Sequence, residues 1–282
     1  MAEWTEGDVP VNGTTIHYYR MGQRGKPPVV LLHGFTDNGL CWMRLATDLA
    51  PDNDLVMIDA VGHGKSGGPE HGFRARAVSD VLAVIEALGV ERPALVGHSM
   101  GASTAAGVAA EAGDRIRAIA LEDPGWRDTP PDPIAEHTAS AGEGSRAPLG
   151  GSAWAEWNRT FKRLSPEERY AQAAVERAAW PAIDRTFWAD AKAQLNLDVL
   201  KEQNPARPSW RDIVRRITCP ILLITADTER GAIVTPAMAE EARRLWRTGK
   251  VVHIPGAGHN IRREQYEPYR VAVTTFLAET AG

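Results

Sequence analysis

A serine inside the segment 97–101 lies on a turn that constrains the fold of the whole chain. The apolar residues 94–96 are typical of the end of a buried strand, and the small residues 102–112 favour a helix. A serine on so tight a turn takes strained backbone angles. Gly97 and Gly101 flank it because a side chain at either position would collide with the adjoining strand or helix. The pattern predicts an exposed Ser99 hydroxyl with backbone N–H groups beside it.

Strand and helix patterns alternate between residues 28 and 124 and resume beyond residue 210. Continuous apolar runs of this kind are buried on both faces of a parallel sheet, so the alternation predicts an α/β fold with helices on both faces. The predicted strands are 14–19, 28–35, 54–59, 116–121, 219–227 and 250–254, and the predicted helices are 41–50, 74–88, 236–246 and 267–278.

The rhythm breaks after residue 124, and no strand pattern appears before residue 208. We expect a helical cap over 125–210, inserted into a core made of 1–124 and 211–282. An insertion at this point of an open sheet lies over the carboxyl ends of the strands. The block carries six of the nine tryptophans. Some are expected to form its small core, and others to face the serine as an aromatic, substrate-binding wall: Trp126, Trp154, Trp157 and Trp188.

A serine hydroxyl needs a base within hydrogen-bond reach, and the base needs a carboxylate to orient it. Among eight histidines, His259 is favoured because it lies in a glycine-flanked loop directly after the last predicted strand. Asp227 is favoured as the carboxylate because it ends the preceding strand and gives the chain order Ser, Asp, His. Glu229, Glu122 and Asp123 remain alternatives.

Acyl transfer also needs donors for the negative oxygen of the tetrahedral intermediate. The backbone N–H of Met100, at the start of the helix after the serine, is one candidate. The N–H of Phe35, just past His33 and Gly34, is the second. This chemistry requires no metal or cofactor, and no cluster of His, Cys, Asp or Glu has metal-ligand spacing.

Composition excludes several other classes. The formal net charge is −4 with scattered basic residues, so neither nucleic acid nor an anionic membrane is an expected partner. The N-terminus resembles no secretory leader, and no apolar run approaches bilayer-spanning length. The only cysteines, Cys41 and Cys219, exclude a disulfide framework and favour the cytoplasm.

Taken in order, these motifs resemble the α/β-hydrolase fold superfamily from about residue 10 to the C-terminus. The segments that carry the resemblance are His33-Gly34-Phe35, Asp59 to Ser66 with Gly62-His63-Gly64 inside it, Gly97 to Gly101, Asp227, and Gly258-His259. The resemblance implies an eight-stranded, mostly parallel sheet, a cap after the sixth strand, and Ser99, His259 and Asp227 as nucleophile, base and acid. One departure concerns the acid, because Glu229 holds the place usual for it, three residues past Ala226, where the family has glycine.

Serine at position 99 differs from the aspartate nucleophile of haloalkane dehalogenases and epoxide hydrolases in that superfamily. We therefore expect a cytoplasmic serine hydrolase that cleaves a carboxylic ester or lactone of an apolar or aromatic small molecule through an acyl-enzyme. The same triad also serves carbon–carbon bond hydrolysis and cofactor-free perhydrolysis. Some members of the superfamily are small-molecule receptors, so a receptor with vestigial hydrolysis is the alternative from another class.

Overall fold

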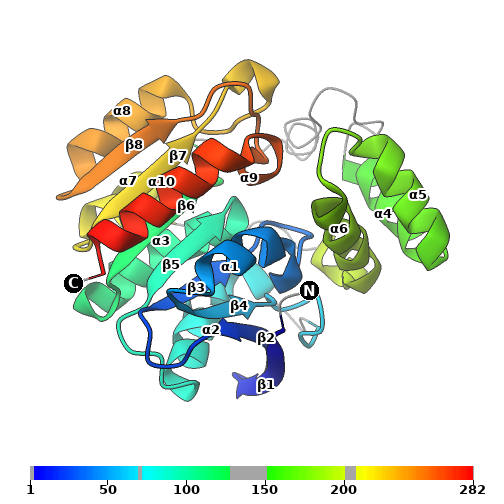
Figure 1. Cartoon of the computed structure of the whole chain (residues 1–282), viewed down its shortest axis with the longest axis horizontal. Coiled ribbons are helices and arrows are strands. Elements are labelled where there is room, and N and C mark those ends of the chain that lie inside the picture. Colours follow the sequence, from blue (N-terminus) through cyan, green and yellow to red (C-terminus); the bar gives the residue numbers. More distant parts are fainter. Residues whose placement is uncertain (1–2, 69–71, 128–150, 201–207, 282) are drawn as a thin grey trace.

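The computed structural model describes residues 3–68, 72–127, 151–200 and 208–281, without the side chains of 151–154. An eight-stranded sheet in the order β1-β2-β4-β3-β5-β6-β7-β8 forms the centre (Figure 1). β1 and β2 pair antiparallel, as do β2 and β4, and all other pairs are parallel. The predicted α/β fold with a mostly parallel sheet is confirmed. The strands are β1 (Thr5–Val11), β2 (Thr14–Gly22), β3 (Pro28–Leu32), β4 (Asp54–Ile58), β5 (Ala94–His98), β6 (Ala118–Glu122), β7 (Ile221–Thr225) and β8 (Gly249–His253).

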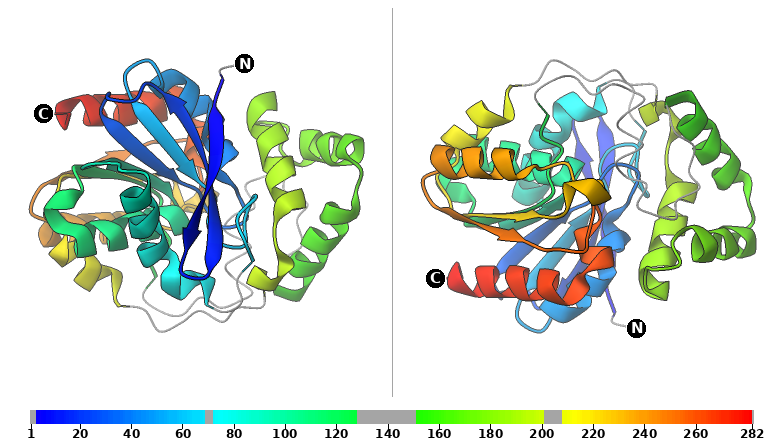
Figure 2. Two further views of the ribbon diagram at one scale, coloured as in Figure 1. Left: turned by 90° about the horizontal axis from the view of Figure 1, so that it is seen from below. Right: turned by 90° about the horizontal axis from the view of Figure 1, so that it is seen from above.

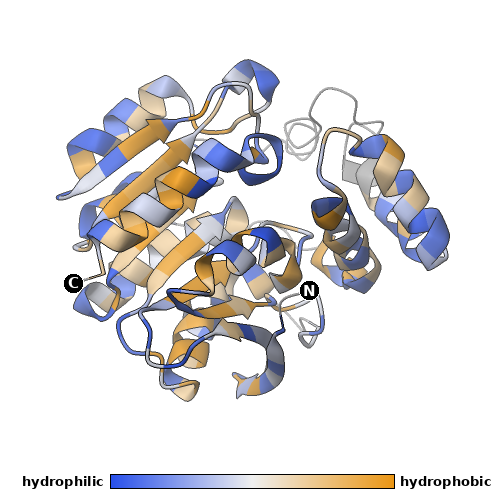
Figure 3. Cartoon of the chain, in the orientation of Figure 1, coloured by the Kyte–Doolittle hydropathy of each residue, from blue (hydrophilic) through white to orange (hydrophobic). Residues whose placement is uncertain are grey.

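Helices cover both faces of the sheet, as Figure 2 shows. Successive strand residues point to opposite faces, so Val30 and Leu32 pack in one core layer while Val29 and Leu31 pack in the other. Figure 3 shows the apolar strands between these layers. The first layer holds α2 (Phe73–Ala87), α3 (Met100–Ala112), α7 (Trp210–Arg216) and α8 (Pro236–Leu245), and the second holds α1 (Met43–Leu49) and α10 (Tyr266–Glu279).

The segment predicted as a cap contributes α4 (Gly151–Arg163), α5 (Pro166–Glu176) and α6 (Ala182–Gln194), which follow β6 and precede β7 in the chain. These helices lie beside the sheet rather than on its faces (Figures 1 and 2). They have a small core of their own around Phe161, Trp180 and Trp188. The boundaries at 125 and 210 stay a prediction, since 128–150 and 201–207 lie outside the described residues.

β1 and the short helix α9 (Ile261–Glu264) were not predicted from the sequence. β1 is an edge strand with mostly exposed side chains, so it has no apolar run. α9 has four residues, which is too short for a helical period. The helix expected at 41–50 is a 3₁₀ turn, η1 (Gly39–Trp42), followed by α1. Further 3₁₀ turns in the described part of the chain are η2 (Gly113–Arg115), η4 (Leu197–Leu200) and η5 (Thr228–Arg230).

Candidate active site

Ser99 stands between β5 and α3 with φ 52° and ψ −110°, a region that residues other than glycine rarely adopt. A Cβ at position 97 would lie 2.5 Å from the Gly101 carbonyl carbon, and one at position 101 would overlap the Leu32 carbonyl of β3. The predicted reason for both glycines is therefore confirmed. The strained backbone persists because its neighbours fix it, since Ser99 N–H donates to the Glu122 carbonyl at 2.9 Å.

His259 lies in the loop between β8 and α9, with its Nδ1 2.6 Å from Asp123 Oδ2. Asp123 directly follows β6 and is fully buried. Its carboxylate also accepts the backbone N–H groups of Ile233, at 2.8 Å, and Val234, at 2.8 Å. A carboxylate at Nδ1 favours the tautomer with its proton there, which leaves Nε2 free to accept a proton.

Asp227, the predicted partner of His259, lies elsewhere, and that prediction is wrong. Asp227 Oδ1 lies 3.1 Å from His253 Nε2, and Oδ2 accepts the Gly256 N–H at 2.7 Å. Asp227 thus braces the loop that leads to the imidazole without touching it. The sheet order explains the difference, because β6 lies between β5 and β7. The end of β6 is therefore one strand nearer to the serine turn than the end of β7.

Of the carboxylates left open by the sequence, only Asp123 contacts His259. Glu122 is buried and accepts the backbone N–H of Arg262 at 2.9 Å and its Nη1 at 3.2 Å. Burial raises the pKa of Glu122, although Arg262 opposes this. Glu229 is exposed in η5.

His98, next to the serine, joins three loops of the site. Its Nε2 lies 2.9 Å from the His259 carbonyl oxygen, and the two rings lie 4.7 Å apart between centroids. A Cβ at Gly34 would lie 2.5 Å from His98 Nδ1, so the loop after β3 approaches the other edge of the ring. Burial, reinforced by the charge of Arg262, lowers the pKa of His98 well below its ordinary value. His98 thus lies between the loop after β3 and the loop that carries His259.

The two expected oxyanion donors are the N–H groups of Met100 and Phe35, which lie in neighbouring segments. Met100 is the first residue of α3, so its N–H has no intrahelical acceptor. Phe35 follows β3, and its ring stacks on Phe73 with centroids 6.0 Å apart. The next residue, Thr36, has φ 68°. The close approach of α3 to the end of β3 brings these backbones to one edge of the sheet. Their role as donors stays a prediction.

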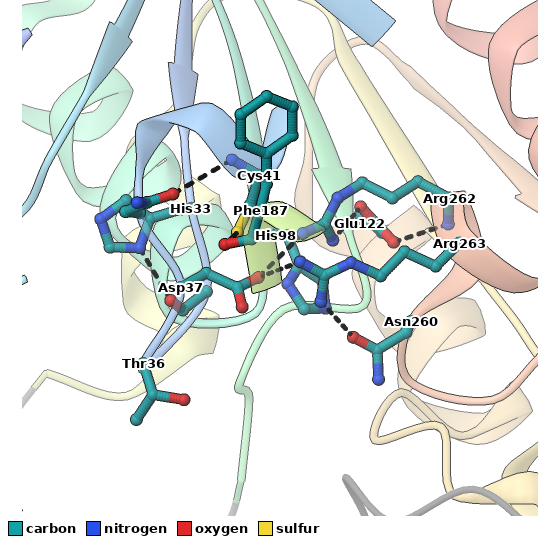
Figure 4. A network of polar contacts seen from close by, with 12 residues as sticks. His33, Thr36, Asp37, Cys41, His98, Glu122, Phe187, Asn260, Arg262 and Arg263 are labelled. Atoms are coloured by element: carbon teal, nitrogen blue, oxygen red, sulfur yellow. Dashed lines mark hydrogen bonds and ion pairs between the residues drawn. The ribbon is translucent and has the colours of Figure 1, made fainter. Parts of the chain in front are cut away.

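A buried ionic network lies behind these loops (Figure 4). Asp37 Oδ2 accepts from Arg262 Nη2 at 3.0 Å and from Arg263 Nη2 at 2.9 Å. Lys192 Nζ lies 3.6 Å from Asp37 Oδ1. Burial alone would raise the pKa of Asp37, but the charges of Arg263, Lys192 and Arg262 outweigh it and hold that pKa below its usual range. The network connects the loop after β3 with α9 and, through Arg262, with Glu122.

The aromatic wall expected from the sequence stays a prediction, and the described tryptophans have core contacts. Trp126 is buried and stacks on Trp210 with ring centroids 4.7 Å apart. Trp188 is buried in the small core of α4–α6. Trp157 packs against that core, and its Nε1 donates to Glu176 at 3.2 Å. The side chain of Trp154 lies outside the described residues.

Sequence reasoning missed the partners of Asp37 altogether. Arg262 and Arg263 follow the predicted base by three and four residues, and Lys192 lies far away in α6. The pair Arg262 and Arg263, directly after the loop that carries His259, was a signal in the sequence that could have indicated cations near the site. Nothing near Lys192 in the sequence distinguishes it from a surface lysine.

Within the described ranges, no group of three or more His, Cys, Asp or Glu side chains is arranged to hold a metal ion. The same part of the chain contains no helix whose length and apolar character would suit a bilayer crossing.

Proteins with a similar sequence or fold include several enzymes. A putative 2-succinyl-6-hydroxy-2,4-cyclohexadiene-1-carboxylate synthase of Bacillus subtilis is 27% identical over 263 residues, which is 91% of this chain and 92% of the relative. An N-formylmaleamate deformylase of Pseudomonas putida is 28% identical over 285 residues, 96% of each chain. The crystal structure of an N-formylmaleamic acid deformylase from Pseudomonas putida S16 shares the fold, with a TM-score of 0.73 at 22% identity over 95% of this chain and 100% of that one.

The model of the alpha/beta hydrolase family matches residues 29–272, from the start of β3 into α10. The match spans the serine turn, Asp123 and His259. The chain belongs to the alpha/beta hydrolase family.

Proposed function

We propose that the chain is a serine hydrolase in which Ser99 attacks an acyl carbon, His259 transfers the proton and Asp123 orients the imidazole. The observation that supports this most is the buried contact of 2.6 Å between His259 Nδ1 and Asp123 Oδ2, next to a strained serine turn. His259 Nε2 takes the serine proton and then gives it to the leaving group. Water, activated by the same imidazole, hydrolyses the acyl-enzyme.

The Phe35 and Met100 N–H groups supply the oxyanion donors in this proposal. The negative oxygen forms where α3 begins, and a helix N-terminus favours negative charge. The leading substrate class is a carboxylic ester or lactone of a small molecule, because no metal or cofactor is needed for its cleavage by this machinery.

The test is labelling with a fluorophosphonate, followed by mapping of the modified residue and a substrate screen. We expect the label on Ser99 and turnover of short p-nitrophenyl esters or of lactones. Ser99→Ala should abolish both, while Ser103→Ala, one helical turn further on, should keep them. Labelling elsewhere, or equal turnover by Ser99→Ala, contradicts the proposal. Ligand binding that survives Ser99→Ala, with negligible turnover by the unchanged protein, favours a receptor.

A second candidate is hydrolysis of an N-acyl compound that carries a carboxylate, and Arg177 favours it. The Arg177 guanidinium lies 5.0 Å from the Trp180 ring centroid and 5.1 Å from that of Trp188. Among the residues that the structure describes, it has no carboxylate or hydrogen-bond partner, and its Nε is buried. Burial lowers the pKa of Arg177; the charge of nearby Glu176 opposes the shift, and that of Arg263 adds to it. An anionic group of a substrate would relieve this unpaired charge.

The names of both relatives described above include a carboxylate-bearing compound, and one removes a formyl group from nitrogen. We therefore expect Arg177→Met to raise KM for N-formylmaleamate about 10-fold or more, as loss of a charged hydrogen bond does. KM for p-nitrophenyl acetate, which is neutral, should stay unchanged. Arg159→Met, which removes an α4 arginine paired with Glu156, is the control. Equal effects on both substrates contradict an anion-binding role for Arg177.

A further inference from the structure

Helix α6 contacts the loop that follows β3 through a lysine. Lys192 Nζ donates to the Thr36 carbonyl oxygen at 2.9 Å and to Thr36 Oγ1 at 2.6 Å. A second contact lies two residues further along the helix, where Asn38 Nδ2 donates to Gln194 Oε1 at 2.8 Å. The contacts join helix α6, which lies outside the sheet core, to the backbone beside the expected oxyanion donor Phe35.

The Lys192 ammonium is fully occupied by the protein. Its side chain is 5% exposed, and its donors face two oxygens of Thr36 and Asp37 Oδ1 at 3.6 Å. An ammonium has three N–H donors, so no donor is left for a substrate. Asp37 does not depend on this lysine, because Arg262 and Arg263 also donate to it. Lys192 adds to the charges that stabilise the Asp37 carboxylate, but both of its hydrogen bonds go to Thr36.

Thr36 needs such support. Its φ of 68° is in the left-handed region, where a β-branched residue is an outlier. A residue in that conformation persists only when its surroundings fix it. Both hydrogen bonds from Lys192 go to this one residue. Without them, relaxation of Thr36 toward negative φ would rotate the backbone next to Phe35 and turn its N–H.

We propose that Lys192 is a positioning residue that holds Thr36, and through it the Phe35 N–H, in the orientation required to stabilise the oxyanion. This inference rests on the proposed function. If Lys192 has this role, the oxyanion site is complete only when α6 is docked against the loop after β3. The segment that contains α6 then affects the reaction through that loop as well as through any contact with substrate.

The first test compares Lys192→Met with the unchanged enzyme on a p-nitrophenyl ester. We expect kcat to fall about 10- to 10²-fold with KM changed less than about 2-fold, because loss of one oxyanion donor costs about 10²- to 10³-fold and here the donor is displaced rather than removed. The melting temperature should stay close to that of the unchanged enzyme, since removal of a buried ammonium offsets the unpaired Thr36 oxygens.

Lys162→Met is the matched control, because Lys162 of α4 also donates to a backbone carbonyl, that of Leu195, at 2.7 Å. It should leave kcat unchanged. Unchanged kcat in Lys192→Met overturns the inference, and so does a loss of kcat that follows only from unfolding. Absence of fluorophosphonate labelling in the unchanged enzyme would instead contradict the proposed function, so the two failures are distinguishable.

A second test uses glycine at position 36. Glycine adopts positive φ readily, so Thr36→Gly should keep the loop conformation without the lysine. We expect Lys192→Met to lower kcat no more than about 3-fold in the Thr36→Gly background, because coupled sites show non-additive effects. An equal loss in both backgrounds shows that Lys192 does not act through the conformation of Thr36 and overturns the inference.

The pH profile gives a third readout. Burial lowers the pKa of Lys192 to about 8, although Asp37 opposes the shift. Above that pH the neutral amine loses its attraction to Asp37 and one donor, so kcat should decrease several-fold, and Lys192→Met should lack this decrease. The same alkaline limb in both proteins contradicts the role. The titratable and charged groups that face the ammonium are Asp37, Cys41, His63, Arg177 and Arg263.

Discussion

Substitution of Asp123 by asparagine tests the central contact of the site. The Val234 N–H donates to Asp123 Oδ1 at 2.8 Å, and the Ile233 N–H lies within reach of both Oδ1, at 3.1 Å, and Oδ2, at 2.8 Å. With both N–H groups able to donate at the Oδ1 position, we expect the amide oxygen of an asparagine to lie there. The amide NH₂ then faces His259 Nδ1, where the carboxylate oxygen lies at 2.6 Å. A donor there forces Nδ1 to be the acceptor and puts the ring proton on Nε2. The imidazole can then no longer accept the proton of Ser99.

This wrong tautomer sets the size of the effect. We expect kcat to fall about 10⁴-fold, the loss known for the same change in a serine-protease triad, which corresponds to about 5 kcal/mol of transition-state stabilisation. The assay is steady-state hydrolysis of a p-nitrophenyl ester, corrected for active enzyme by fluorophosphonate titration. Folding is checked by circular dichroism. The spectrum should be unchanged, because asparagine has the same shape as aspartate.

Asp227→Asn is the matched control. Its amide oxygen can still accept the Gly256 N–H, and the Asp227 side chain is 18% exposed, so we expect activity within about 3-fold of the unchanged enzyme. The reasoning is refuted if Asp123→Asn keeps kcat within about 10-fold, or if Asp227→Asn loses as much activity as Asp123→Asn.

Three further substitutions test the packing around the site. Gly101→Ala places a methyl group into the carbonyl at the end of β3, so we expect a loss of at least about 2 kcal/mol in urea unfolding, or failure to fold. Arg262→Met keeps the backbone N–H that donates to Glu122 but removes the guanidinium that pairs with both Glu122 and Asp37, two buried carboxylates. The free energy of unfolding should therefore decrease by about 3–5 kcal/mol in the same measurement. Trp126→Ala removes a buried ring stacked on Trp210, so the free energy of unfolding should decrease by about 3–5 kcal/mol, with KM unchanged. A raised KM would instead show that Trp126 contacts substrate.

The sequence was sufficient wherever the chemistry is local. Gly97, Ser99 and Gly101 lie within one turn, so a strand pattern, a helix pattern and two glycines define the elbow without any tertiary information. His259 was favoured for a related reason, since a residue in the loop after the last parallel strand emerges at the same sheet edge as the serine turn. The parallel sheet itself follows from the alternation of buried strands and helices.

The carboxylate partner of His259 was misjudged because it depends on which strands are neighbours. Asp123 and Asp227 each follow the end of a strand within two residues, and both precede His259 in the chain. Only the sheet order, with β6 beside β5, decides between them. The contact from Lys192 to Thr36 joins residues 156 positions apart and depends on how α6 docks, so no local pattern could predict it.

The buried ionic network indicates why these loops keep a common geometry. Asp37 and Glu122 are the buried acids, and Arg262, Arg263 and Lys192 are the cations that contact them. Buried ion pairs often add no more stability than apolar side chains of similar size, because desolvation of the charges offsets much of their attraction. These buried charges make displacement of the loops unfavourable in free energy, since a shift of one loop leaves a charge unpaired in the interior. Asp37 lies two residues from the expected oxyanion donor, Glu122 precedes Asp123, and Arg262 follows His259 by three residues. One network therefore fixes the relative positions of the three segments on which the proposed reaction depends.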